Sequence, residues 1–183
     1  MKILRLLAPV VALFSGAVWA GGSLDLSINN ETAALEYDAT RMGSPLHVSA
    51  GFLHHEEDGN LATLGLNAVD VRTAQSPLKI GIGGKLYAYF AEEEEGGALA
   101  IGGFARYMPP ELNGLGLGAH MYYAPSVLSF DSTENLVDVG LRVEYRLLPT
   151  ALVYVGYRFV EANEEALDVE IVKAGHFGLR IDF

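Results

Sequence analysis

The feature that most constrains this chain is a strict alternation of apolar and polar side chains, which continues to the last residue. Near the C-terminus, Phe177, Leu179, Ile181 and Phe183 fall at every second position. Side chains of a β-strand point alternately to its two faces, so this stretch predicts a strand with one apolar face. Chain ends of soluble proteins usually fray, and an alternating strand that reaches the terminal residue therefore predicts a terminus that is itself paired.

The same alternation recurs nine times before this strand. We expect strands at about 24–28, 33–40, 46–54, 61–70, 78–90, 99–107, 115–123, 137–145, 153–159 and 169–183. The mature chain shows no sustained helical period, so the predicted fold class is all-β. In a soluble sandwich the apolar faces would pack inward. In an outer-membrane barrel they would contact lipid, and the charged faces would line the interior.

Two observations favour the barrel. Short turns at 42–45, 71–76, 109–114 and 148–150 alternate with longer or acidic links such as 56–58, 92–95 and 161–165, as short periplasmic turns alternate with external loops in such barrels. Aromatic residues also lie near strand ends, where membrane interfaces favour them: Tyr89, Phe90, Tyr107, Tyr122, Tyr123, Tyr145, Tyr157, Phe159 and Phe183. The prediction is an antiparallel up-and-down transmembrane β-barrel of about ten strands, or eight if the short first hairpin is not part of the wall. The longest loop is expected at 125–135.

The N-terminus has the features of an export signal. Lys2 and Arg5 flank the start of an apolar run, and small residues precede Gly21. We therefore expect a cleaved signal peptide at 1–20 and one barrel domain at 21–183, located in the bacterial outer membrane. The chain has no cysteine, and its formal net charge of −11 argues against a nucleic-acid partner.

Several segments resemble the YfaZ family of Gram-negative outer-membrane proteins. They are GSLDLS at 22–27, the hairpin from LHH at 53–55 to LG at 64–65, GIGGK at 81–85, GFARY at 103–107, YAPS at 123–126 and GLRVEY at 140–145. The resemblance extends from the signal peptide to the C-terminus. It implies an outer-membrane barrel, and because the family has no defined biochemical role, it implies no reaction.

The polar faces carry charged side chains that we expect to line the lumen. These are Glu36, Asp38, Lys79, Lys85, Arg106, Asp138, Arg142, Glu144, Arg146, Arg158 and Arg180. Charges buried in a narrow barrel must pair or contact ordered water. Two hypotheses follow. The charges form an ion-pair plug that fixes the barrel, or they line a narrow porin-like channel for which glycines on the same faces leave room.

Other candidate sites are weak. His54, His55, Glu56, Glu57 and Asp58 combine ligands for a divalent metal with the Asp and His of omptin-type surface proteases, but adjacent strand residues face opposite sides. The acids at 92–95 could gather divalent cations or bridge to lipopolysaccharide phosphates, although they lack the spacing of a dedicated site. His120 and His176 are expected inside the barrel without a nucleophile beside them. We predict no catalytic residue, no metal site and no cofactor.

The predicted function is a small, non-enzymatic outer-membrane barrel, either structural with a charged lumen or a narrow porin-like channel. The alternative is a surface hydrolase, or a barrel that binds divalent cations or lipopolysaccharide through its acidic external loops. Expected partners are outer-membrane lipid, lipopolysaccharide and the barrel-assembly machinery, which reads the terminal signal Phe177, Leu179, Ile181 and Phe183. The sequence indicates no solute and no oligomeric state.

Overall fold

The computed structural model describes residues 21–40, 44–56, 59–70, 76–90, 95–131, 133–164 and 168–183. The predicted signal peptide at 1–20, Glu57, Asp58 and the acidic residues 92–94 lie outside these ranges. Among the described residues, no helix is both long and apolar enough to cross a membrane.

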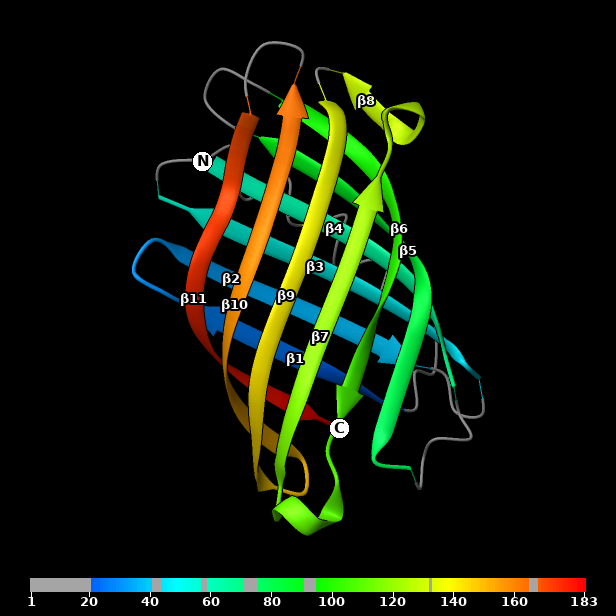
Figure 1. Ribbon diagram of the computed structural model, residues 1–183, viewed down its shortest axis with the longest axis vertical. Coiled ribbons are helices and arrows are strands. Elements are labelled where there is room, and N and C mark those ends of the chain that lie inside the picture. The colour runs from blue at the N-terminus through cyan, green and yellow to red at the C-terminus, as the bar shows by residue number, and fades with distance from the viewer. Residues whose placement is uncertain are drawn as a thin grey trace, which may run out of the picture.

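Ten antiparallel strands form a closed barrel (Figure 1). They are β1 (Gly21–Ile28), β2 (Thr32–Thr40), β3 (Leu46–His55), β4 (Gly59–Val69), β5 (Leu78–Phe90), β6 (Glu95–Tyr107), β7 (Leu115–Ala124), β9 (Thr133–Leu148), β10 (Ala151–Glu164) and β11 (Asp168–Asp182). Each strand pairs with the next along the chain, and β11 pairs with β1. The predicted antiparallel up-and-down barrel is confirmed, with ten strands rather than eight, because the first hairpin is part of the wall.

The seam between the first and last strands extends to the terminal residue. Leu24 pairs with Ile181 and Leu26 with Leu179. The Gly22 N–H donates to the Phe183 carbonyl at 2.8 Å, and the Phe183 N–H donates back to the Gly22 carbonyl at 3.0 Å. The predicted paired terminus is therefore confirmed, and the barrel has no open edge at this seam.

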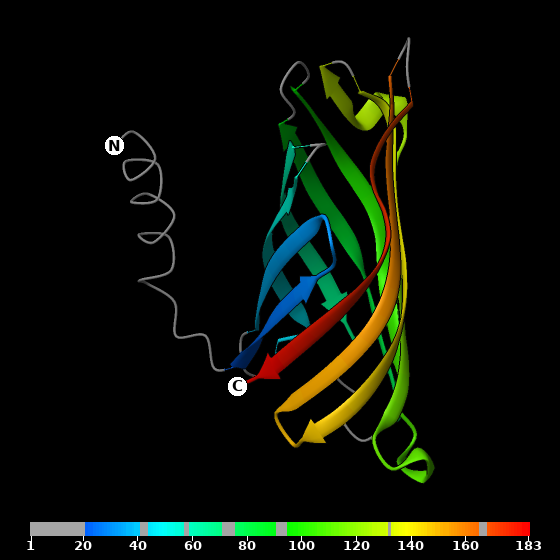
Figure 2. The same ribbon diagram turned by 90° about the vertical axis from the view of Figure 1, so that its left-hand side faces the viewer.

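The two ends of the barrel differ. Figure 2 shows the start of β1 and the end of β11 side by side at one end, with the β9–β10 turn and the 3₁₀ helix η3 (Pro110–Leu112). We call this the terminal end. The opposite end, the loop end, carries the turn at 29–31, the 3₁₀ helix η4 (Ser126–Leu128) and the short strand β8 (Ser129–Asp131). The described residues of the loop predicted at 125–135 thus form regular elements, because β8 pairs with Gly96–Ala98 of β6 and β9 already begins at Thr133.

The alternation in sequence becomes an alternation between the outside and the lumen. Ile82, Ile101 and Leu141 point outward and are exposed by 67%, 62% and 64%. A continuous exposed apolar wall of this kind is typical of a barrel surrounded by lipid. The expected interfacial position of Tyr89 and Tyr122 is wrong. Both side chains point to the lumenal face of their strands, and both residues are only 3% exposed.

Candidate functional site

The lumen is the candidate site, and its loop-end half contains a buried apolar cluster. Its members come from seven strands, β3, β4, β5, β6, β7, β9 and β10: Leu53, Leu61, Tyr87, Tyr89, Ala98, Ala100, Tyr122, Ala124, Leu136, Val160 and Ala162. Polar and charged side chains were predicted on these faces, and an apolar cluster was not. A signal was present, because pairs of consecutive apolar residues such as Phe52 with Leu53 and Phe159 with Val160 make both faces apolar near the loop end.

Next to this cluster, Asp138 on β9 is the centre of a buried polar group. Its side chain is 0% exposed. The Arg158 guanidinium donates from Nε to Oδ1 at 3.0 Å and from Nη2 to Oδ2 at 2.8 Å. The Tyr87 hydroxyl donates to Oδ2 at 2.7 Å, and His120 Nε2 lies 3.1 Å from Oδ1. One carboxylate therefore connects β5, β7, β9 and β10 through charge-assisted hydrogen bonds.

A second ion pair, of which the lysine is buried and the carboxylate is 41% exposed, lies in the same part of the lumen. Lys85 Nζ donates to Glu36 Oε2 at 2.8 Å, and Lys85 is 7% exposed. The same ammonium lies 5.5 Å from the centroid of the Tyr122 ring, and the Tyr122 hydroxyl donates to Asn67 Oδ1 at 2.9 Å. These contacts span the lumen from β2 and β4 to β5 and β7.

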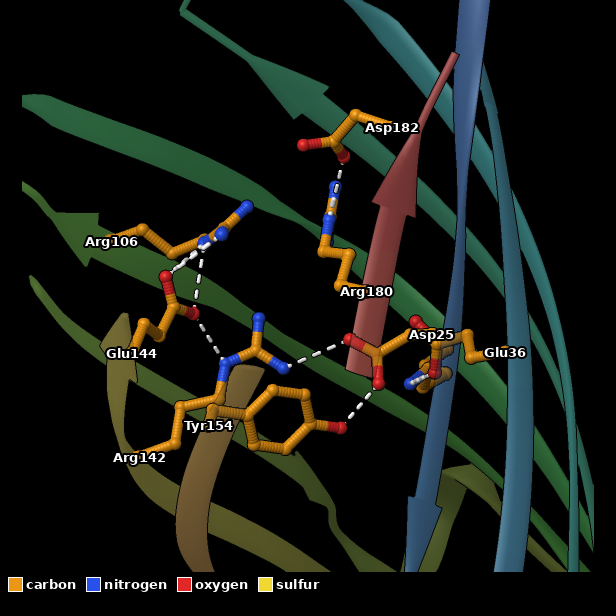
Figure 3. A network of polar contacts seen from close by, with 9 residues as sticks. Asp25, Glu36, Arg106, Arg142, Glu144, Tyr154, Arg180 and Asp182 are labelled. Carbon is orange, nitrogen blue, oxygen red and sulfur yellow. Dashed lines mark hydrogen bonds and ion pairs between the residues drawn. The ribbon is translucent and has the colours of Figure 1, made fainter. Parts of the chain in front are cut away.

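Towards the terminal end, Glu144 on β9 accepts from two arginines (Figure 3). Arg106 donates to it through Nε and Nη2, the latter at 2.8 Å, and Arg142 Nε donates to Oε1 at 2.6 Å. Arg142 continues the chain through Nη1 to Asp25 Oδ2 at 3.1 Å, and the Tyr154 hydroxyl donates to the other oxygen of Asp25. The resulting network connects β1, β6, β9 and β10.

The space beside several lumenal glycines is occupied by these side chains and is not empty. A Cβ on Gly118 would lie 2.9 Å from both Arg142 Nε and Glu144 Oε1. A Cβ on Gly140 would lie 2.3 Å from His120 Cε1, and one on Gly178 would lie 2.1 Å from Tyr154 Cζ. At these three glycines, the space that the channel hypothesis requires is therefore occupied by neighbouring side chains.

The remaining predicted charges lie near the terminal end. Asp38 Oδ1 is 2.8 Å from His47 Nδ1, and Arg180 Nε donates to Asp182 Oδ1 at 2.8 Å. Lys79 and Arg146 have no ion pair with any described residue, and both line a cavity of about 540 Å³ at this end.

The structure pairs seven of the eleven predicted charges with one another, as Glu36–Lys85, Arg106–Glu144, Arg142–Glu144 and Arg158–Asp138. Other partners in the lumen were not among the predicted charges. These partners are Asp25, His47, Tyr87, His120, Tyr154 and Asp182. Their signal in the sequence was their position, since each lies on the same strand face as the predicted charges. A second cavity of about 160 Å³ lies inside the barrel and is lined by residues from Asn29 and Thr32 to Lys79 and Arg180.

The histidine pair at the loop end does not converge on one site. His55 points inward, is 8% exposed, and its Nε2 lies 3.8 Å from Glu31 Oε2. His54 is exposed, and its Nδ1 lies 2.9 Å from Asn60 Oδ1. Across the described ranges, no group of three or more His, Asp or Glu is placed to hold a metal ion. Glu57 and Asp58, the other predicted members, lie outside those ranges.

A solved structure and a protein family are similar to this chain. OmpT (in-vitro folded), an outer membrane protein of Vibrio cholerae, is a similar solved structure with a TM-score of 0.42 and 13% sequence identity. The alignment covers 88% of this chain and 64% of that one, so the chain spans less than two thirds of that protein's length. No curated protein matches the chain. The family described as "YfaZ precursor" matches residues 1–183, and the chain therefore belongs to the YfaZ family.

Proposed function

We propose that this protein is an exported outer-membrane barrel with a structural role, whose lumen is closed to solutes. Its support is physical. Nine of the ten wall strands have nine or more residues, a length that crosses a bilayer when the strand is tilted, and the outward side chains form the exposed apolar wall described above. The description of the family as a precursor agrees with a signal peptide at 1–20 that is cleaved from the domain at 21–183. No enzymatic activity is part of the proposal.

The main support for a closed lumen is the buried apolar cluster at the loop end. It joins seven of the ten wall strands, and Asp138 beside it is fully buried. Barrels of about eight strands have interiors that side chains fill, whereas porins of 16 to 18 strands enclose an aqueous channel. A ten-stranded barrel is close in size to the barrels whose interiors are filled by side chains. We infer that the ion pairs fix the wall strands relative to one another and that the cluster excludes solutes.

A narrow channel is the second candidate, and one observation favours it. The cavity of about 160 Å³ has lining residues from both ends, from Asn29 and Thr32 to Lys79 and Arg180. At about 10–15 Å³ of this volume per molecule, it accommodates on the order of ten waters. That volume suits a thread of ordered water beside the ion pairs, and it is small for a hydrated solute.

Planar-bilayer recording of the refolded barrel distinguishes the two candidates. We expect no discrete current steps from the unmodified protein. The double variant Tyr87→Ala/Tyr122→Ala removes two rings from the cluster, which are 0% and 3% exposed, and should produce steps. Tyr145→Ala makes the same chemical change on the outer surface, where the ring is 48% exposed, and should stay silent. Discrete steps from the unmodified protein would instead support the narrow channel.

The location is tested separately. We expect the protein to fractionate with outer membranes and to migrate differently in gels before and after heating, as a folded barrel does. Recovery in the soluble periplasmic fraction would contradict the membrane location without bearing on the bilayer recordings.

A further inference from the structure

An unusual pair of like charges faces the lumen at the terminal end. Lys79 on β5 and Arg106 on β6 are direct cross-strand partners, and both side chains point inward. Like charges directly opposite each other destabilise a sheet. Arg180, from β11 on another part of the wall, is within electrostatic range of both. Three cations from three strands therefore gather at one opening of the barrel.

The acids nearby compensate these cations only in part. Arg106 shares its partner Glu144 with Arg142, so one carboxylate serves two guanidinium groups. Arg180 bonds Asp182 on its own strand, whose side chain is 47% exposed to solvent. Lys79 has no directly bonded counter-ion among the described residues. Asp38 interacts electrostatically with Lys79 but is already paired with His47.

These cations line a cavity of about 540 Å³, which is large enough for a phosphate-sized group. Arg146 lies at the same cavity and is exposed. The acids in the lining are Asp38, Asp70, Glu144 and Asp182, and each of them has a partner within the protein. Lys79 differs from these acids, because the three donors of its ammonium have no ion-pair partner among the described residues.

We propose that the terminal-end cavity is an oxyanion site for a phosphate group, bound by Lys79, Arg106 and Arg180. A phosphate between them accepts the free donors of Lys79 and relieves the repulsion between Lys79 and Arg106. The group comes either from free phosphate or from a phospholipid headgroup at the rim, where Phe183 and Met108 also line the cavity. The site does not depend on whether the lumen conducts, because it lies at one end of the barrel.

Isothermal titration of the refolded barrel in nonionic detergent with inorganic phosphate tests the site. We expect saturable binding that weakens as sodium chloride is raised. Lys79→Gln should weaken binding by about tenfold or more, because it removes a charged hydrogen-bond donor. Lys173→Gln removes the same charge from β11 near the loop end and should leave the affinity unchanged.

Thermal unfolding gives a readout that separates binding from a folding defect. Phosphate should raise the midpoint of the unmodified barrel and leave that of Lys79→Gln unchanged. Without phosphate, Lys79→Gln should be at least as stable as the unmodified barrel, because the like-charge pair is gone.

Short-chain phosphatidylglycerol in place of phosphate identifies the source of the group. Binding of either probe that Lys79→Gln abolishes supports the site, and the tighter probe names the source. Failure of both probes to bind would overturn the proposal. Equal losses in Lys79→Gln and Lys173→Gln would also overturn it, because they would show a response to net charge alone.

Discussion

The substitution Asp138→Asn tests whether the buried carboxylate holds the barrel together. In the structure, each oxygen of Asp138 accepts a hydrogen bond from Arg158. Oδ2 also accepts from the Tyr87 hydroxyl, and Oδ1 lies within hydrogen-bond distance of His120 Nε2. Asparagine replaces one oxygen by an NH₂ group, which only donates. In either orientation of the amide, one N–H of the Arg158 guanidinium then faces another donor, and its charge loses the counter-ion to which it is directly bonded.

The expected cost follows from this geometry. Removing one partner of a buried ion pair costs about 3–5 kcal/mol of unfolding free energy, because the remaining charge stays desolvated. That lowers the ratio of folded to unfolded protein by roughly two to four orders of magnitude. The double variant Asp138→Leu/Arg158→Met removes both charges and fills their space with apolar atoms. It should recover most of the loss, since exchanging a whole buried pair for apolar groups is often neutral or stabilising.

Urea unfolding of the barrel in lipid vesicles, followed by circular dichroism and by gel mobility, measures these free energies. Glu134→Gln is the matched control, because it removes the same charge from an exposed position on the same strand. It should change the free energy by less than about 0.5 kcal/mol. A cost under about 1 kcal/mol for Asp138→Asn, or a double variant as unstable as the single one, would contradict this role of the buried ion pair.

Two further predictions concern packing and assembly. Gly118→Ala should lower the free energy of unfolding by about 1–3 kcal/mol, since its Cβ would lie 2.9 Å from Arg142 Nε and Glu144 Oε1. Gly175→Ala on the outer surface is the control. Its Cβ would meet no atom closer than 3.7 Å, and the same unfolding assay should show no change. Deleting Phe183 removes the two reciprocal hydrogen bonds to Gly22 and the ring whose centroid lies 6.1 Å from that of Tyr37. The level of folded barrel in outer membranes should therefore fall relative to total protein. Unchanged levels would contradict the assembly role of the terminal strand.

Much of the fold follows from the sequence because side-chain direction in a strand depends only on position. The period of two places Leu179 and Ile181 outward and His176 and Arg180 inward whatever the neighbouring strand is. The same rule predicted all ten wall strands and the paired terminus. It also predicted lumenal faces for the charged side chains, since a charged side chain on the lipid face of a barrel is costly.

The partners inside the lumen depended on the tertiary structure. Alternation gives the face of a side chain but neither its depth along the barrel nor what lies across from it. Arg142 meets Asp25, 117 positions away in the chain, and Tyr87 meets Asp138, 51 positions away, only because the register and tilt of the closed sheet bring them to the same level. The apolar cluster has the same origin. Tyr89 and Tyr122, expected at the membrane interface, fill the lumen because closing ten strands leaves an interior that side chains must occupy.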